Sequence, residues 1–303
     1  MLRTPPFFVF MGSPDFAVTI LEGLLAQGWK PALVVTETSK PVGRRHTLTP
    51  TPVDLFARQQ QLPVSTPATK AELLNRLRDL TDSLELILVA AYGRLLPADV
   101  LDLPRYGAIN VHASLLPKYR GASPIQAAIV AGETETGITL MQITAGLDTG
   151  PILAQFPVPI LPTDSTATLT QRLAQCTVKT MVPALESYLL QPTPLTSQIE
   201  AQATYTTKIT KKDGRINIES IDPIRLDRLV RAYTPWPSVY TDQFGTRLQI
   251  LAGTYANAGY TITRLQWAGK LPVDGQTFAR AYPDVLTKLP PSITLGATTS
   301  MVP

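Results

Sequence analysis

The sequence has a single cysteine, Cys176, and only two histidines, His46 and His112. One cysteine cannot form an internal disulfide, which is typical of a cytosolic protein. Structural zinc sites use four Cys and His ligands, so residues of these types are too few for one, and we predict no metal. Cys176 falls within a predicted helix, between Leu173 and Met181. We expect it to pack as a small apolar residue rather than act as a nucleophile.

Long apolar runs are also missing. No run approaches the ~18 residues that a membrane-spanning helix needs, so we predict no membrane association. The stretch Phe7 to Met11 is too short for the hydrophobic part of a signal peptide, has no cleavage pattern, and is interpreted as a first β-strand. The turn that follows, Gly12 to Phe16, has one glycine, which argues against a G-x-G-x-x-G dinucleotide fingerprint. A helix could still begin there with its N-terminus facing a ligand.

Apolar residues are plentiful: 44% of the 303 residues are hydrophobic and 17% are charged. This composition argues against intrinsic disorder and predicts one large domain or two smaller ones. The net charge of +4 is unevenly placed. Residues 1–190 hold 15 Lys and Arg against 15 Asp and Glu, whereas residues 191–303 hold 12 against 8. The last third therefore leans toward a polyanionic partner, although an ordinary solvated surface would give the same excess.

The first 190 residues alternate between strand and helix patterns. The strand-like segments are continuous apolar runs, as in a sheet covered on both faces. We predict strands at 7–11, 32–35, 85–90, 107–112 and 137–143, and helices at 16–27, 53–61, 70–80 and 165–189. Because strands that alternate with helices are joined by crossovers, the pattern predicts an α/β fold with a mostly parallel sheet.

The composition changes after residue 190. Residues 191–207 are predicted to be a linker that separates a first domain, 1–190, from a second, 208–287. The second domain has a short helix that Asp222 could cap, with Pro223 at its first position, and strand-like pieces near 247–251 and 260–266. It is predicted to be small and β-rich. Residues 288–303 are predicted to be a loose tail.

Three polar residues carry the strongest chemical signal. Asn110 and His112 lie two apart at the end of a predicted strand, so their side chains share a face, and open α/β sheets bind ligands at the carboxyl ends of strands. Asp148, in the turn 146–150, could orient His112 or take a proton. An amide that stabilises an oxyanion beside an imidazole suits acyl-type transfer. The structural alternatives are a packed core histidine and an aspartate that caps its own turn.

Two neighbouring segments have features of binding sites. Residues 114–124 start apolar and end basic, which fits a wall for a flat, partly apolar ligand beside an anion-friendly patch. The loop 37–52 is long for a connection in an α/β unit. Lys40, Arg44, Arg45 and His46 give this loop cationic donors for phosphates. An exposed mobile loop is the alternative interpretation.

Taken together, these motifs resemble the methionyl-tRNA formyltransferase family. The resemblance runs from about residue 7 to about residue 240, and the motif around Asn110 and His112 is specific to folate-dependent formyltransferases. The segments that carry it are Met11 to Ala17, Ala91 to Gly93, Ile109 to Pro117, Tyr119 to Gly121, Pro124 to Gln126, Gly146 to Gly150, Ala203 to Tyr205, Lys208 to Ile209, Lys212 to Gly214 and Pro235 to Pro237. Ala113 departs from the family's usual glycine.

The resemblance implies an enzyme of translation initiation. It would transfer a formyl group from 10-formyltetrahydrofolate to the amino group of initiator methionyl-tRNA, in the cytoplasm, without a metal and as a monomer. The implied fold is a Rossmann-like formyltransferase domain followed by a small OB-like β-rich domain, here shortened between Ile250 and Thr261. The implied catalytic residues are Asn110, His112 and Asp148; the folate-site residues are Ser114, Leu115, Leu116, Pro117, Tyr92 and Gly93; the tRNA-contacting residues are Lys40, Arg44, Arg45, Lys208, Lys211 and Lys212.

Other functions share parts of this pattern. The nearest alternative is a folate-dependent N-formyltransferase that acts on an amino sugar or nucleotide amine, but a small substrate needs neither the loop with Arg44 and Arg45 nor a basic last third. A glycinamide ribonucleotide formyltransferase normally ends near the end of the first domain. A non-catalytic tRNA- or folate-binding module would not need Asn110, His112 and Asp148 together. A hydrolase would use water in place of the amine and release formate.

Overall fold

The computed structural model describes residues 5–43, 46–191 and 194–297, and their contacts divide the chain into two compact units. The first unit comprises the chain up to Gly121 together with Glu135–Pro159 and Thr170–Tyr205. The second comprises Ala122–Thr134, Ile160–Leu169 and the chain from Thr206 onward. The linear division proposed from the sequence places those two short pieces, which lie before residue 190, in the first domain.

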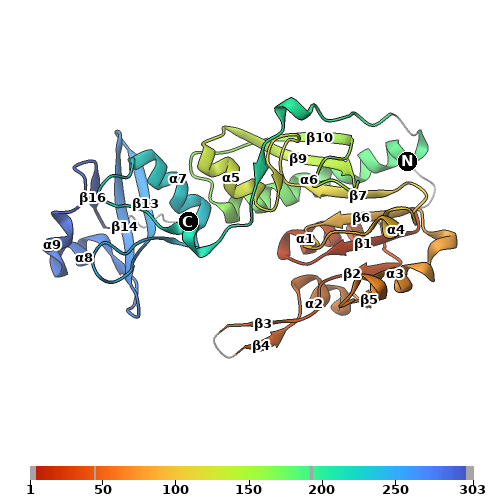
Figure 1. The fold of residues 1–303 in the computed structure, drawn as a ribbon, viewed down its shortest axis with the longest axis horizontal. Coiled ribbons are helices and arrows are strands. Elements are labelled where there is room, and N and C mark those ends of the chain that lie inside the picture. Colours follow the sequence, from red (N-terminus) through yellow and green to blue (C-terminus); the bar gives the residue numbers. More distant parts are fainter. Residues whose placement is uncertain (1–4, 44–45, 192–193, 298–303) are drawn as a thin grey trace. The chain divides into compact units, whose positions relative to one another are not determined.

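A seven-stranded sheet in the order β10-β9-β7-β6-β1-β2-β5 forms the centre of the first unit (Figure 1). The neighbours from β5 to β7 run parallel, β9 is antiparallel to β7, and β10 is antiparallel to β9. The mostly parallel α/β sheet predicted from the sequence is therefore confirmed. The strands are β1 (Phe8–Gly12), β2 (Leu33–Val35), β5 (Val64–Ser65), β6 (Leu86–Ala90), β7 (Ala108–His112), β9 (Glu135–Gln142) and β10 (Ile152–Pro159).

Helices connect these strands. Every residue of β1 and of β6 is buried, as expected for parallel strands covered on both faces. Thr51 and Thr69 cap two of the helices by accepting hydrogen bonds from backbone N–H groups of the first turn. The helical segments of this unit are α1 (Asp15–Ala26), α2 (Pro52–Gln59), α3 (Lys70–Arg78), η1 (Thr81–Ser83), α4 (Ala98–Leu101), residues 170–190 of α6 (Thr166–Leu190) and η2 (Glu200–Gln202).

The order of connections reverses at β1. From β1 the chain moves outward through β2 to β5, and it then returns to the other side of β1 as β6 and β7. The carboxyl ends of β1 and β6 therefore form a topological switch point, where open α/β sheets bind ligands. Ser13 Oγ, just after β1, donates to the Tyr92 carbonyl, just after β6, at 3.2 Å. A Cβ at Gly12 would lie 2.8 Å from the Ala90 carbonyl oxygen, so glycine allows this close approach of the two strands.

The second unit contains the small β-rich domain. Its sheet has the order β12-β13-β14-β15, with β16 also paired to β14, and among the described residues no pairing closes it into a barrel. Asp222 caps α7 as predicted, because its Oδ1 accepts from the Arg225 N–H at 2.9 Å. The elements of this unit are α5 (Pro124–Ala131), η3 (Lys211–Gly214), α7 (Pro223–Tyr233), β12 (Val239–Thr241), β13 (Leu248–Ala256), β14 (Gly259–Trp267), β15 (Val273–Asp274), α8 (Gly275–Ala281), α9 (Pro283–Leu286) and β16 (Ile293–Leu295).

The predicted loose tail is wrong for its first part. β16 pairs in parallel with residues 260–262 of β14, and Ile293 is buried in the apolar core of this unit. The strand forms because Ile293 buries a large apolar side chain, a signal that the neighbouring prolines and small polar residues obscured. Residues 298–303 of the predicted tail lie outside the described residues. In the parts of the chain that are described, no helix is long and apolar enough to cross a membrane.

Candidate active site

His112 is the last residue of β7, and its ring is contacted through both nitrogens. The side chain is only 6% exposed. Its Nε2 lies 2.9 Å from the carbonyl oxygen of Tyr119. A carbonyl can only accept a hydrogen bond, so this contact assigns a proton to Nε2. Nδ1 faces Asp148 Oδ2 at 3.7 Å and is therefore the nitrogen that can exchange a proton with the site.

Asp148 reaches His112 from a tight turn after β9. Its backbone is left-handed, with φ of 51°, a conformation that aspartate tolerates better than most residues. Its Oδ2 accepts from the Gly121 N–H at 2.8 Å, whereas Oδ1 has no hydrogen-bond partner among the described residues. The turn also needs Gly150, because a Cβ there would lie 1.8 Å from the Gln142 carbonyl oxygen. One carboxylate oxygen is thus fixed, and the other is left for a ligand.

Asn110 lies two residues before His112 on β7, so the two side chains share a face of the sheet. Asn110 is half-buried, and its amide makes no hydrogen bond within the part of the chain that the structure describes. Polar groups at such depth are usually paired. The structure therefore brings His112 and Asp148 together and places on the same strand face as His112 an amide whose donors are available to a ligand.

The segment that follows His112 is held rigidly. Ser114 is fully buried, and its carbonyl accepts from Thr139 Oγ1 at 2.6 Å. The same hydroxyl oxygen accepts from the Leu116 N–H at 3.1 Å, and the Leu116 side chain is 3% exposed. Leu115 and Pro117 are half-buried. Of the four predicted folate-site residues in this segment, these two keep apolar surface that a ligand could contact.

The Tyr92–Gly93 pair lies at the switch point beside β6. Burial raises the pKa of Tyr92, whose ring is 2% exposed and packs in the apolar core of the sheet. Gly93 has φ of 87°, and a Cβ there would lie 3.5 Å from the Glu37 carboxyl group. That carboxylate is paired with Lys40 at 2.6 Å and with Arg94 at 3.6 Å. Lys40, predicted to contact phosphates, is therefore an exposed cation that also has an acidic partner.

The remaining predicted tRNA contacts fall in two places. β3 (Lys40–Val42) and β4 (Thr47–Thr49) form an antiparallel hairpin that projects from the sheet beside α2 (Figure 1). Arg44 and Arg45, which lie between these two strands in the sequence, are outside the described residues. Lys208, Lys211 and Lys212 are exposed side chains of the second unit.

Comparison with known proteins identifies the family. Residues 7–185 match the model of the formyl transferase family, and residues 208–261 match that of the formyl transferase C-terminal domain. The chain belongs to the formyl transferase family. It is an enzyme of that class, and the small second domain of this formyltransferase corresponds to the family's C-terminal domain.

Relatives and solved structures agree with this assignment. A methionyl-tRNA formyltransferase of Chloroflexus aggregans is 42% identical over 250 residues, covering 82% of this chain and 80% of the relative. A structure of methionyl-tRNA formyltransferase from Clostridium thermocellum matches 89% of this chain and 100% of its own, with a TM-score of 0.60 and 15% identity. An N-formyltransferase from Helicobacter canadensis in complex with folinic acid and dTDP-3-aminofucose has a TM-score of 0.63 and 19% identity, covering 84% and 89% of the two chains. These two structures share the fold.

Arg120 of this formyltransferase was not predicted as a site residue, and its surroundings differ from those predicted for this segment. The sequence predicts an anion-friendly patch here, yet the Arg120 side chain is 1% exposed and pairs with Glu200 at 2.8 Å. Burial alone would lower the pKa of Arg120, but hydrogen bonds to Glu200 and Tyr205 raise it above its ordinary value. The same contacts lower the pKa of Glu200. The positive charge of Arg120, at the basic end of the segment 114–124, is therefore balanced by the carboxylate of Glu200.

We expect the stabilisation of the fold by the Glu200 contact to be lost in acid. Because its pKa is lowered on folding, the contribution of Glu200 is complete above the unfolded value of about 4.3 and is lost as the pH falls through the folded value. Thermal unfolding of the wild type and of Glu200→Gln checks this. The wild type should have the higher melting temperature at pH 7, and the difference should shrink as the pH falls below about 4.3. A difference that stays the same down to the lowest pH at which the protein is folded would contradict it.

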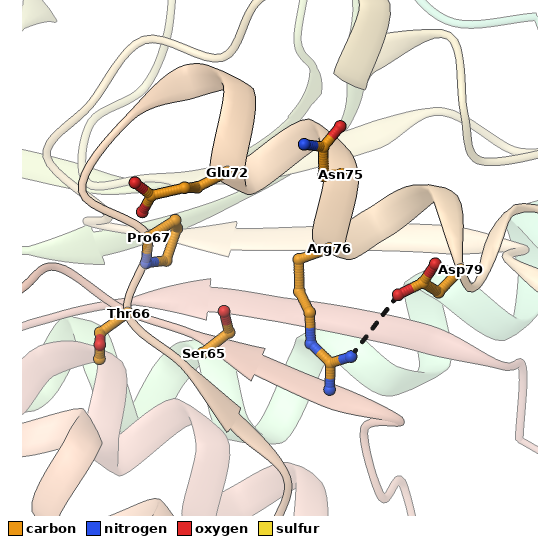
Figure 2. Close-up of a pocket in the computed structure, with 7 residues that line it drawn as sticks. All are labelled: Ser65, Thr66, Pro67, Glu72, Asn75, Arg76 and Asp79. Carbon is orange, nitrogen blue, oxygen red and sulfur yellow. Dashed lines mark ion pairs between the residues drawn. The ribbon is translucent and has the colours of Figure 1, made fainter.

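A separate hollow lies at the edge strand of the sheet. Figure 2 shows that it is formed by the end of β5 and by α3, with Arg76 directed toward Asp79 at 3.8 Å. Its lining residues are Ser65, Thr66, Pro67, Glu72, Asn75, Arg76 and Asp79, and none belongs to the predicted catalytic set. Within residues 5–43, 46–191 and 194–297, no group of three or more His, Cys, Asp or Glu side chains is arranged to hold a metal ion.

Proposed function

We propose that this formyltransferase transfers the formyl group of 10-formyltetrahydrofolate to the amino group of methionine on initiator tRNA. It would act in the cytoplasm, as a monomer, at the start of translation. The observation that carries the proposal is the 42% identity, over 82% of this chain, to a protein named methionyl-tRNA formyltransferase. The alternative that shares the donor, formyl transfer to an amino sugar, is supported by shared folds at 17% to 19% identity.

In the proposed reaction the uncharged amine attacks the formyl carbon. A carbon–nitrogen bond forms, and the carbonyl oxygen becomes negative. The Asn110 amide donates to this oxygen, which is where preorganised donors lower the barrier most. His112 Nδ1 and Asp148 take the proton that the amine loses, and a proton passes to the folate nitrogen as its bond to the formyl carbon breaks. Among the described residues, neither the Asn110 amide nor Asp148 Oδ1 has a hydrogen-bond partner, which supports these assignments.

The two substrates would contact different segments. We assign the folate to Ser114, Leu115, Leu116 and Pro117, with Tyr92 and Gly93 as the adjacent wall. Their position beside the switch point supports this, as do the apolar surfaces of Leu115 and Pro117. We assign the tRNA phosphates to Lys40, Arg44, Arg45, Lys208, Lys211 and Lys212, since cationic side chains are the usual phosphate contacts.

A side-by-side assay tests the function. The protein is given 10-formyltetrahydrofolate with charged initiator tRNA, a charged elongator tRNA or a nucleotide-linked amino sugar, and formylated product and free formate are both measured. We expect product with the initiator tRNA at a rate at least tenfold above the others. Product with the amino sugar alone would favour the alternative function. Formate without any formylated product would show a hydrolase.

We expect Lys212→Ala to weaken tRNA binding evenly, without changing which tRNA is preferred. A lysine that contacts one phosphate contributes about one unit to the slope of log affinity against log salt. Affinities of the wild type and the variant for charged initiator tRNA, measured from 50 to 200 mM salt, check this expectation. Lys270→Ala, which removes another exposed lysine of the same unit, is the matched control. Equal slopes for wild type and Lys212→Ala would remove Lys212 from the tRNA contacts.

A further inference from the structure

The segment predicted as a linker packs on the catalytic loops of the first unit. Thr196 and Ile152 exchange two backbone hydrogen bonds, of 2.7 and 2.9 Å. Further along, the Thr204 carbonyl accepts from the Arg120 N–H at 2.8 Å, and Thr204 Oγ1 accepts from the Tyr119 N–H at 2.8 Å. Residues 196–204 are therefore hydrogen-bonded to the backbone at Tyr119 and Arg120, and the carbonyl of Tyr119 is the one that contacts His112.

Gln198 connects this segment to the turn of Asp148. Its Nε2 donates to the Asp148 carbonyl at 2.8 Å and to the Gly150 carbonyl at 2.7 Å. Its Oε1 accepts from Arg120 Nε at 3.0 Å. Both hydrogens and the oxygen of the amide are thus used, which fixes the orientation of the side chain. The left-handed backbone of Asp148 is held at its carbonyl, in addition to the contact that its carboxylate makes with Gly121.

Arg120 is the partner that makes this arrangement rigid. Its buried guanidinium donates to Gln198, to both carboxylate oxygens of Glu200 at 2.8 and 3.1 Å, and to Tyr205 Oη at 2.8 Å. A buried charge is tolerated only when it is paired in good geometry, so the neighbours of Arg120 have little freedom. Tyr119 and Gly121, the residues on either side of it, contact His112 and Asp148 respectively.

We propose that Gln198 and Arg120 are positioning residues that set the geometry of His112 and Asp148, so that the predicted linker contributes to the active site. The inference rests on the proposed function for the reaction that it affects. Neither side chain has to touch the substrates. Both act on the backbone: Gln198 on the turn of Asp148, and Arg120 on residues 119–121. Displacing a catalytic group by about 1 Å can lower a rate by about 100-fold, so these supports are expected to affect turnover rather than binding.

Two substitutions at Gln198 test this. Gln198→Met keeps the length of the side chain and removes its hydrogen bonds, whereas Gln198→Ala also removes its bulk. We expect both to lower kcat about 10- to 100-fold while KM for the folate and the tRNA changes less than about threefold. Gln59→Ala, which removes an exposed glutamine of α2, is the control and should match the wild type. A loss in Gln198→Ala but not in Gln198→Met would assign the effect to packing and overturn the proposal.

A second measurement does not depend on activity. The sequence has two histidines, so ¹⁵N signals of the His112 ring can be assigned with His46→Gln as reference. We expect the ring-nitrogen signals of His112 to move in Gln198→Met and to stay in place in Gln59→Ala. Unchanged signals together with unchanged kcat would overturn the positioning role. If the wild type does not formylate tRNA but the His112 signals still move, the positioning role stands and the proposed function fails.

Discussion

Asn110→Ala is expected to lower kcat about 100- to 1,000-fold, with little change in KM for either substrate. The Asn110 amide has no partner among the described residues, so removing it breaks no bond of the fold. The amide is needed when the formyl oxygen becomes negative, and loss of one preorganised oxyanion donor usually costs this much. An interaction made only in the transition state lowers kcat and kcat/KM equally. Steady-state kinetics with initiator methionyl-tRNA measures both.

The control for this variant is another asparagine. Asn75 is exposed on α3 and lines the hollow of Figure 2, away from the catalytic set. Asn75→Ala should keep full activity. A thermal unfolding curve for Asn110→Ala should lie within a few degrees of the wild type, because no hydrogen bond to another described residue is lost. If Asn110→Ala raised KM and left kcat unchanged, Asn110 would bind the substrate and would not stabilise the oxyanion.

The parallel part of the fold could be predicted because burial leaves a simple pattern. Strands such as β1 and β6 are apolar at every position, and a continuous apolar run next to an amphipathic helix is typical of a parallel strand with its crossover. The direction of β9 could not be predicted, since an apolar run reads the same in either direction. β10 was not predicted as a strand, because it is only partly buried and contains Gln155 and two prolines. In the second unit, the hairpin between β13 and β14 turns at Asn257 and Ala258, with φ of 49° and 60°. Alanine at such a position gives no turn signal.

In the candidate active site, too, some contacts could be predicted from the sequence and others could not. The contact between His112 and Asp148 could be predicted from their chemistry, because an imidazole beside a carboxylate is typical of proton transfer. The sheet does not explain it, since β9 runs antiparallel to β7 and the two strands end at opposite edges. The support from Gln198 and Glu200 could not, because each lies 78 or more residues from Arg120 along the chain. Their segment, rich in prolines and small polar residues, was predicted as a linker. Composition indicates that a segment lacks regular structure, but it does not indicate whether that segment packs against a neighbour.

The largest effect is expected for Asp148→Asn, about 1,000- to 10,000-fold in kcat. The asparagine keeps one oxygen that can accept from the Gly121 N–H, so the turn should persist. Because the same atom, Oδ2, accepts from Gly121 and faces His112 Nδ1, the asparagine oxygen would still face the ring, but without the negative charge that stabilises the protonated imidazole. An aspartate beside a catalytic imidazole produces losses of this size when it is made neutral. Single-turnover formylation with saturating substrates measures the chemical step.

The matched control is Asp79→Asn, since Asp79 has a side chain that is 71% exposed and lies outside the candidate active site. It should keep full activity. Asp148→Glu is informative as well: it retains the charge but adds a methylene to a carboxylate whose Oδ2 is held at 2.8 Å by Gly121, so partial activity is expected. If Asp148→Asn retained activity within threefold of the wild type, the carboxylate would serve the turn alone. The proton would then have to leave by way of His112 without it.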